Sequence, residues 1–197
     1  MGYSVEAYLV PLDQLQPLYG AADNTLIEAI ERRLADEIAE LNTWLEEDWD
    51  IPAPTIEQVV RATIAGQFPW PYEQAPYQAV LQLFCKYVGE VLPNAMFTGL
   101  SPLGVRYGES EDPPMGMLVF RSKAPVIIPG IEDAHMYRVG HITHNIAAQM
   151  LKEREPSHAA QLDCDVPENW EQCAAAQFHG WLEAAVRTPR AIVTFFL

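Results

Sequence analysis

Two hydrophobic spacings alternate along the chain and predict its strands and helices. In YSVEAYLV, residues 3–10, apolar side chains fall at every second position on one face, as in a half-buried strand. From Thr25 to about Asp48 the apolar residues instead recur every three or four positions, which predicts one long amphipathic helix begun by a Thr25–Glu28 capping box. The apolar residues of that helix are Leu26, Ile27, Ile30, Leu34, Ile38, Leu41 and Leu45.

The rest of the pattern predicts shorter helices and strands around one long loop. Residues 93–116 hold four prolines and four glycines and predict the loop. We therefore predict an α+β fold, a single domain of residues 1–197 with a small mixed β-sheet packed against several helices, including one long helix in the N-terminal half. Strands are predicted at residues 117–120, 124–128, 136–142 and, near the middle of the sheet, 190–197. Helices are predicted at residues 12–18, 56–66 after a Thr55–Gln58 capping box, 76–91, 143–154 and beyond a capping box of Asp165 and Glu168.

The charge of the chain is strongly negative and unevenly placed. Lys and Arg number 12 and Asp and Glu number 27 among 197 residues, which gives a net charge of −15. The first fifty residues hold twelve of these acids and only Arg32 and Arg33 as bases. Nucleic acid is excluded as a direct partner because phosphate contacts need a positive surface. A basic protein partner would be attracted, whereas the plainer interpretation is that the acids keep the protein soluble.

No segment predicts membrane insertion or secretion. The longest uncharged run, residues 91–105, contains Pro and Gly and is shorter than the roughly 18 residues that a membrane helix needs. The N-terminal segment lacks the basic residues of a secretory signal. The three cysteines, Cys85, Cys164 and Cys173, are odd in number and irregular in spacing, so we expect no disulfide framework and a cytoplasmic location.

Three of the five histidines fall within DAHMYRVGHITHN, which raises the question of a metal site. A catalytic zinc site needs three protein ligands that converge at about 2 Å, often with two His one helical turn apart. His141 and His144 instead straddle a predicted strand-to-helix junction, and His135 lies six residues earlier. We therefore expect no metal and no other cofactor, and we keep His141 and His144 only as candidate catalytic residues.

Glu37 is a carboxylate that the helical spacing places inside the apolar stripe, between Ile30 and Trp44. A buried carboxylate needs a partner or has a raised pKa. The structural interpretation is an ion pair with Arg33 or Arg61, and the functional one is a polar group at the floor of a pocket. Glu37 is therefore a third candidate catalytic residue.

An acidic cluster with two tryptophans ends the predicted long helix, in ELNTWLEEDWD, residues 40–50. Carboxylates at a helix C-terminus oppose the macrodipole, so they do not favour the isolated helix. Either tertiary packing of Trp44 and Leu45 outweighs them, or the cluster contacts a basic partner with Trp49 as an aromatic anchor. The candidate binding residues are Glu46, Glu47, Asp48, Trp49 and Asp50.

Three segments of the chain resemble a known family. MGYSVEAYLVPLDQL, VGHITHNIAAQML and WLEAAVRTPRAIVTFFL are similar, in that order, to the beginning, middle and end of the YfbM-like family of uncharacterised bacterial proteins. The resemblance implies a mixed α/β fold of one domain and no established activity. It also implies that Thr143 is a helix N-cap and His141 a side chain at the end of the sheet. His144 and Asn145 depart from the family's Thr-Pro-Glu helix start.

The leading functional hypothesis is a non-enzymatic, cytoplasmic binding protein whose acidic surface meets a basic protein partner. An immunity protein that blocks a basic toxin is one form of this hypothesis. The alternative is a hydrolase or a small-molecule-binding protein with a pocket near the 93–116 loop, built with Glu37 and the histidines. No hydrolase motif supports the alternative, since GLSPLG differs from the G-x-S-x-G nucleophile elbow.

Overall fold

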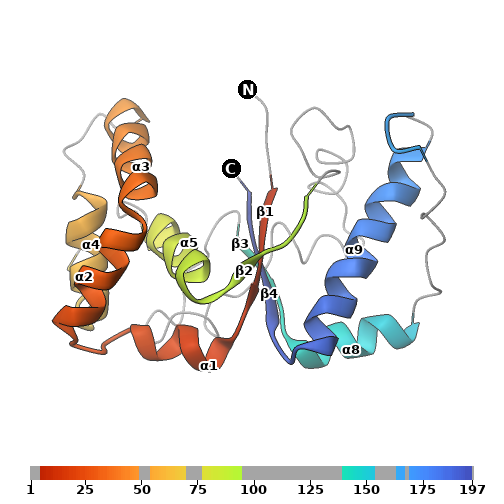
Figure 1. The fold of residues 1–197 in the computed structure, drawn as a ribbon, viewed down its shortest axis with the longest axis horizontal. Coiled ribbons are helices and arrows are strands. Elements are labelled where there is room, and N and C mark those ends of the chain that lie inside the picture. Colours follow the sequence, from red (N-terminus) through yellow and green to blue (C-terminus); the bar gives the residue numbers. More distant parts are fainter. Residues whose placement is uncertain are drawn as a thin grey trace. The chain divides into compact units, whose positions relative to one another are not determined.

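The computed structural model confirms the α+β class (Figure 1). Its described residues form seven α-helices, one 3-10 helix and a four-stranded sheet. Among these residues no helix has the length and apolar character to cross a membrane. The predicted strands at 117–120 and 124–128 lie outside the described residues, as does most of the 93–116 loop. The structure describes residues 5–48, 54–69, 77–94, 139–153, 163–166 and 169–196.

The chain divides into two compact units, which we call the sheet unit and the helical unit. The prediction that residues 1–197 form one domain stays a prediction. The sheet unit contains β1 (Val5–Val10), β2 (Glu90–Val91), β3 (Val139–Ile142), α8 (His144–Glu153), α9 (Trp170–Arg187) and β4 (Ala191–Phe196). The helical unit contains α1 (Leu12–Leu15), the 3-10 helix η1 (Gln16–Leu18), α2 (Asn24–Arg33), α3 (Ala35–Asp48), α4 (Ile56–Ile64) and α5 (Tyr77–Val88).

The sheet has the strand order β2-β1-β4-β3. Strand β4 therefore lies between β1 and β3, as its β-branched and aromatic sequence predicts. Thr194 of β4 is opposite Ala7 of β1 on one side and Gly140 of β3 on the other. All pairings among the described strands are antiparallel, where we expected a mixed sheet. Residues 90–91 were predicted to end the helix of residues 76–91, but α5 ends at Val88 and these two residues form β2. Two residues are too few to show the periodicity of a strand.

The two faces of the sheet follow from the alternation of the side chains. Helix α9 and part of α8 pack on the face that carries the predicted apolar positions of β1 (Figure 1). Side chains of the opposite face are also buried, and the rings of Tyr8 and Phe195 meet edge to face at 5.8 Å. The buried core of the first face is Val5, Ala7, Leu9, Leu92, Ile142, Ala147, Cys173, Ala174, Phe178, Trp181, Leu182, Ala185 and Ile192.

The predicted long helix is two helices, because Leu34 leaves the helical conformation between α2 and α3. Leu34 is only 3% exposed, and its N–H still donates to the Ile30 carbonyl at 2.9 Å. The predicted Thr25–Glu28 capping box is also wrong. Asp23 is the N-cap of α2, and its carboxylate accepts from the Thr25 N–H at 2.8 Å. A charged carboxylate is a stronger acceptor than the Thr hydroxyl, so the N-cap lies two residues earlier than predicted.

The second predicted capping box, at the start of α4, is confirmed. The Gln58 side chain accepts from the Thr55 N–H at 3.0 Å, and the Thr55 hydroxyl accepts from the Gln58 N–H at 3.4 Å. Beyond the other end of α4, Gly66 has a φ of +70° and lies against Gly20, which has a φ of +78°. The Gly20 N–H donates to the Thr63 carbonyl at 3.1 Å, so this contact ties the turn after η1 to α4.

The two helices of the sheet unit begin differently. The Thr143 hydroxyl accepts from the Ile146 N–H at 3.4 Å, in agreement with Thr143 as the N-cap of α8. The prediction that Asp165 caps the last helix is wrong, since α9 begins at Trp170 after Asn169. The side chain of Asn169 makes no capping hydrogen bond. Contacts other than a side-chain N-cap therefore hold the start of α9.

Candidate functional site

The outward side of α3 carries an aromatic side chain between carboxylates. Asp36, Glu40 and Trp44 follow one another at four-residue spacing, which places them along one side of the helix. All three are exposed, and 49% of the Trp44 surface is open to solvent. On the opposite side, Ile38 and Leu45 are only 3% exposed. We call Asp36, Glu40 and Trp44 the α3 ridge.

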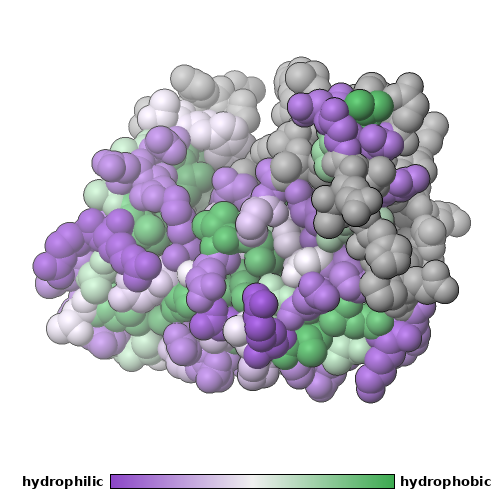
Figure 2. All heavy atoms as spheres, turned by 45° about the vertical axis from the view of Figure 1, so that its right-hand side comes forward, coloured by the Kyte–Doolittle hydropathy of each residue, from purple (hydrophilic) through white to green (hydrophobic). Residues whose placement is uncertain are grey.

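The helical unit that carries the α3 ridge is acidic. Its described residues include four bases and eleven acids, a difference of seven negative charges. Hydrophilic side chains cover much of the outer surface of this unit, with small apolar areas between them (Figure 2). The bases are Arg32, Arg33, Arg61 and Lys86. The acids are Asp13, Asp23, Glu28, Glu31, Asp36, Glu37, Glu40, Glu46, Glu47, Asp48 and Glu57.

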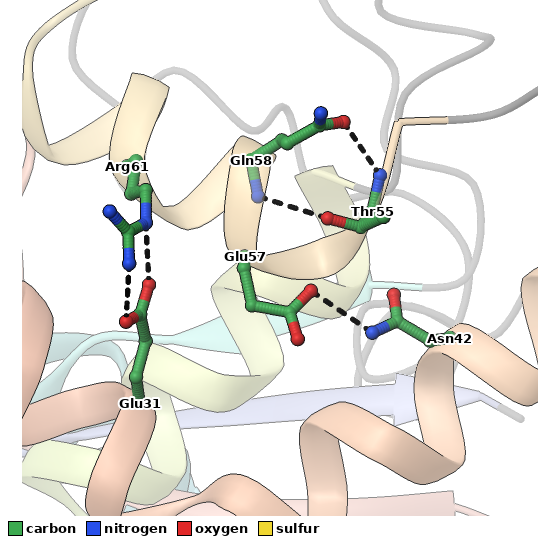
Figure 3. Close-up of polar contacts among 6 residues, drawn as sticks. All are labelled: Glu31, Asn42, Thr55, Glu57, Gln58 and Arg61. Carbon is green, nitrogen blue, oxygen red and sulfur yellow. Dashed lines mark hydrogen bonds and ion pairs between the residues drawn. The ribbon is translucent and has the colours of Figure 1, made fainter.

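A charged pair at the surface joins α4 to α2 (Figure 3). The guanidinium of Arg61 donates from Nε and Nη2 to the two carboxylate oxygens of Glu31, at 2.8 and 2.7 Å. This two-bond geometry is the strongest form of an Arg–carboxylate contact. The hydrogen bonds to Glu31 raise the pKa of Arg61. The exposed charge of Arg61 is therefore paired with the carboxylate of Glu31 within the unit.

Asn42 joins α3 to α4 through both ends of its amide (Figure 3). Its Nδ2 donates to the Glu57 carboxylate at 3.0 Å, and its Oδ1 accepts from the Ile56 N–H at 2.8 Å. Burial raises the pKa of Glu57, but hydrogen bonds from Asn42 and from its own backbone outweigh this effect, and the pKa is lowered. Nothing in the sequence marks Asn42 except the low helix propensity of an Asn within a predicted helix.

Glu37 lies in the first turn of α3 and forms an ion pair with Lys86 of α5. The predicted partners are wrong. Arg33 lies over the ring of Tyr87, with its Cζ 5.1 Å from the ring centroid, and Arg61 bonds to α2. The hydrogen bond from Lys86 lowers the pKa of Glu37, so the carboxylate is charged at neutral pH. This partnership opposes the use of Glu37 as a proton donor.

The candidate binding residues fall at the end of α3 and beyond it. Glu46, Glu47 and Asp48 form the last residues of the helix, which has no basic residue in its last turn. Trp49 and Asp50 lie outside the described residues. Glu47 follows Trp44 by three residues, so its helical position continues the line of the α3 ridge.

The candidate histidines lie in different elements. His141 belongs to β3, opposite Val193, and burial lowers its pKa. His144 is the first residue of α8, and its Nδ1 lies 3.1 Å from the Ala185 carbonyl of α9. His135 lies outside the described residues. In the described part of the chain, no three His, Cys, Asp or Glu side chains are grouped as metal ligands would be.

A disulfide joins Cys164 to Cys173, with the two Cα atoms 5.9 Å apart. The expectation of no disulfide is therefore wrong for this pair. A turn at residues 163–166 brings Cys164 back to the first part of α9, which the nine-residue separation alone does not predict. Cys85 is a free thiol with no exposed surface, and burial raises its pKa.

The first residues of the predicted 93–116 loop form hydrogen bonds with other parts of the sheet unit. The Pro93 carbonyl accepts from Trp181 Nε1 at 2.8 Å. The Asn94 amide donates to the Val5 carbonyl and accepts from Gln177 Nε2, the latter at 2.9 Å. The remaining residues of this loop, on which the pocket hypothesis depends, lie outside the described residues.

The described residues define an α+β protein with an antiparallel sheet, two helices on one of its faces, and an acidic helical unit. The chain belongs to the family described as Domain of unknown function (DUF7691), and the match covers residues 1–197. No curated protein and no solved structure matches this sequence.

Proposed function

We propose that this protein is a non-enzymatic binding protein and that the α3 ridge receives a basic protein partner. The observation that carries the proposal is the exposure of Trp44 on a helix that contains six carboxylates and no base. Tryptophan is enriched among the residues that dominate binding energy at protein interfaces. The carboxylates around it favour a partner of positive charge.

The contacts beneath the α3 ridge support this proposal because they fix α3 before a partner arrives. Asn42 holds α3 to α4, and Glu37 holds it to α5. A surface that is already ordered loses less conformational entropy on binding. The ridge therefore has the rigidity of a preformed recognition surface.

The exposed part of Trp44 sets the size of the expected effect. A buried Trp removes about 200 Å² from water, so the 49% that is still exposed corresponds to about 100 Å². At about 25 cal/mol per Å², covering this area contributes about 2.5 kcal/mol, or roughly 50-fold in affinity. The carboxylates contribute mainly to association rate and to salt dependence.

We favour an immunity-type protein that blocks a basic toxin, a cytoplasmic location, and kinship with the YfbM-like family. The net charge of −15 and the three segments that resemble the family support them. The enzymatic alternative gains no support from Glu37, because its carboxylate is paired with Lys86.

The experiment compares capture and binding by matched variants of the α3 ridge. Proteins captured from a cell extract at low salt by the parent, and not by Trp44→Ala, are purified and titrated by calorimetry. We expect Trp44→Ala to weaken binding about 50-fold. Glu40→Gln is compared with Glu28→Gln, which removes the same charge from the exposed side of α2. Only Glu40→Gln is expected to flatten the dependence of affinity on salt markedly.

A second variant addresses the end of α3. Replacing Glu46 and Glu47 by Gln and Asp48 by Asn removes three charges that oppose the macrodipole, so stability is expected to stay the same or rise. Partner binding is expected to weaken. Equal binding by the parent, Trp44→Ala and the triple variant across salt concentrations would leave solubility as the function of the acids.

A further inference from the structure

The Cys164–Cys173 disulfide connects an exposed turn to a buried helix face. Cys164 lies in the turn of residues 163–166, all of which are exposed. Cys173 is only 3% exposed and belongs to the apolar core between α9 and the sheet. One half-cystine therefore lies at the surface, where a thiol in solution can approach it, and the other is in the core.

Among the described residues, Asn169, which precedes α9, makes two hydrogen bonds to the turn. The Asn169 N–H donates to the Val166 carbonyl at 3.0 Å, and its Nδ2 donates to the Asp163 carbonyl at 2.9 Å. Within the turn, the Asp165 N–H donates to the Asp163 carboxylate at 3.0 Å. Residues 163–166 are exposed, so their groups can hydrogen-bond to water instead. Opening the disulfide would therefore release the turn from α9.

Helix α9 is attached to the rest of the sheet unit by contacts other than the disulfide. Phe178 and Leu182 have no exposed surface, and Trp181 is 3% exposed and bonds to the Pro93 carbonyl. A reduced Cys173 would stay in place, because a thiol packs as a small apolar group. The helix is thus expected to keep its position whether or not the disulfide is present.

We propose that the Cys164–Cys173 disulfide is a reversible redox switch that attaches the turn of residues 163–166 to α9 when oxidised and releases it when reduced. Its function is local, since the core beneath α9 does not depend on the bridge. Cys85 takes no part, because it belongs to the helical unit and is fully buried.

The chemistry is thiol–disulfide exchange with a low-molecular-weight couple such as glutathione. The Cys164 thiolate attacks one sulfur of glutathione disulfide and displaces one glutathione thiolate. The Cys173 thiolate then attacks Sγ of Cys164, closes the protein disulfide and displaces the second glutathione thiolate. The two protons lost by the cysteines end on the two released thiolates. Reduction is the reverse sequence, beginning at the accessible Cys164.

The residues around Cys164 give this exchange a charge preference. Asp163 and Asp165 flank Cys164 in the exposed turn. Their carboxylates repel the glutathione thiolate, which has a negative net charge, more than the cysteamine thiolate, whose ammonium group makes its net charge zero. We therefore expect cysteamine to reduce the bridge several-fold faster than glutathione at equal thiolate concentration. The substitutions Asp163→Asn and Asp165→Asn should bring this ratio of reduction rates closer to one.

The first experiment counts thiols in the full-length protein. The chain is equilibrated in glutathione buffers of different redox ratio, quenched with acid, unfolded and alkylated for intact-mass analysis. We expect one alkylated cysteine in the oxidised form and three in the reduced form, with no populated form carrying two. In Cys85→Ala the counts become zero and two. Three alkylated cysteines in every oxidising buffer would overturn the proposal.

The second experiment measures amide hydrogen exchange in both redox states. Reduction is expected to speed exchange at residues 163–169 by at least about tenfold, while residues 139–153 and 177–196 keep their protection. Cys164→Ser, oxidised or reduced, should reproduce the exchange of the reduced parent, and Cys173→Ala provides a second bridge-free variant with an apolar side chain in the core. Unchanged exchange at 163–169 would show a bridge without a switching effect. Lost protection throughout α9 and the sheet would show a fold-stabilising disulfide. If Asp163→Asn and Asp165→Asn left the ratio of the reduction rates by cysteamine and glutathione unchanged, the assigned role of the carboxylates would be overturned.

Discussion

The ion pair between Glu37 and Lys86 is expected to stabilise the helical unit by coupling α3 to α5. A double-mutant cycle with Glu37→Gln and Lys86→Met measures this coupling. Each substitution keeps the size of the side chain and removes its charge. The side chains of Lys86 and Glu37 are 37% and 29% exposed, so the pair is only partly screened by water. Exposed pairs contribute about 0.2–1 kcal/mol, and we expect a coupling energy at the upper end, about 1 kcal/mol.

The coupling energy depends on pH, and the lowered pKa of Glu37 determines the direction of this dependence. The hydrogen bond from Lys86 lowers the folded-state pKa of Glu37 below the ordinary value of 4.5. The unfolded state therefore binds the proton first as the pH falls. The stabilisation is fully present above pH 4.5 and is lost as the pH falls through the folded-state pKa. The coupling energy should be near zero once both states are protonated.

The assay is urea unfolding of the four proteins of the cycle, followed by far-ultraviolet circular dichroism at pH 7 and at successively lower pH. Glu40→Gln serves as the control for Glu37→Gln, because Glu40 lies on the exposed side of the same helix. Its effect and that of Lys86→Met should be additive. A coupling below about 0.2 kcal/mol at pH 7, or the same coupling with Glu40 as with Glu37, would refute a specific pair.

Two further predictions concern glycine positions and a histidine. Gly66→Ala should destabilise the protein by about 1–2 kcal/mol, because φ is +70° and the new Cβ would lie 3.3 Å from the Gly20 Cα. Gly180→Ala, within α9 and with nothing inside 4 Å of the new Cβ, should instead stabilise the protein by about 0.5–1 kcal/mol. Both variants are measured by thermal unfolding, and stability changes of the same sign would contradict this reasoning. Burial lowers the folded-state pKa of His141 below 6.5, so the unfolded state takes up its proton first and stability falls as the pH drops from 6.5 towards the folded-state pKa. His141→Gln should reduce this fall in urea unfolding between pH 7 and 5, and an identical pH profile would show that His141 does not titrate differently in the two states.

Features set by neighbouring residues could be predicted from the sequence. The alternation in β1 identified the side chains that pack beneath α9, and Thr55 with Gln58 identified the start of α4. The β-branched and aromatic residues of β4 indicated a central strand. Each of these depends on periodicity, on residue type or on contacts within one turn, which the sequence contains directly.

Features that depend on distant residues could not be predicted in the same way. Glu37 and Lys86 are 49 positions apart, whereas the predicted partners were Arg33, one helical turn back, and Arg61 from the next helix. The break at Leu34 leaves the apolar spacing intact, because Leu34 is buried like its neighbours in the stripe. The disulfide depends on a turn that returns the chain to α9. In each case the tertiary arrangement selects among pairings that the local sequence permits equally well.

The carboxylates of the helical unit differ in what their charges do for the fold. Glu31, Glu37 and Glu57 accept hydrogen bonds from other elements of the unit, so their removal is expected to cost stability. Asp36 and Glu40 are exposed at four-residue spacing on the same helix, and like charges at this spacing are mildly unfavourable. The paired carboxylates contribute to the stability of the fold, whereas Asp36 and Glu40 do not. The exposed carboxylates beside Trp44 are therefore where a function other than folding is best sought, and a substitution there separates recognition from stability.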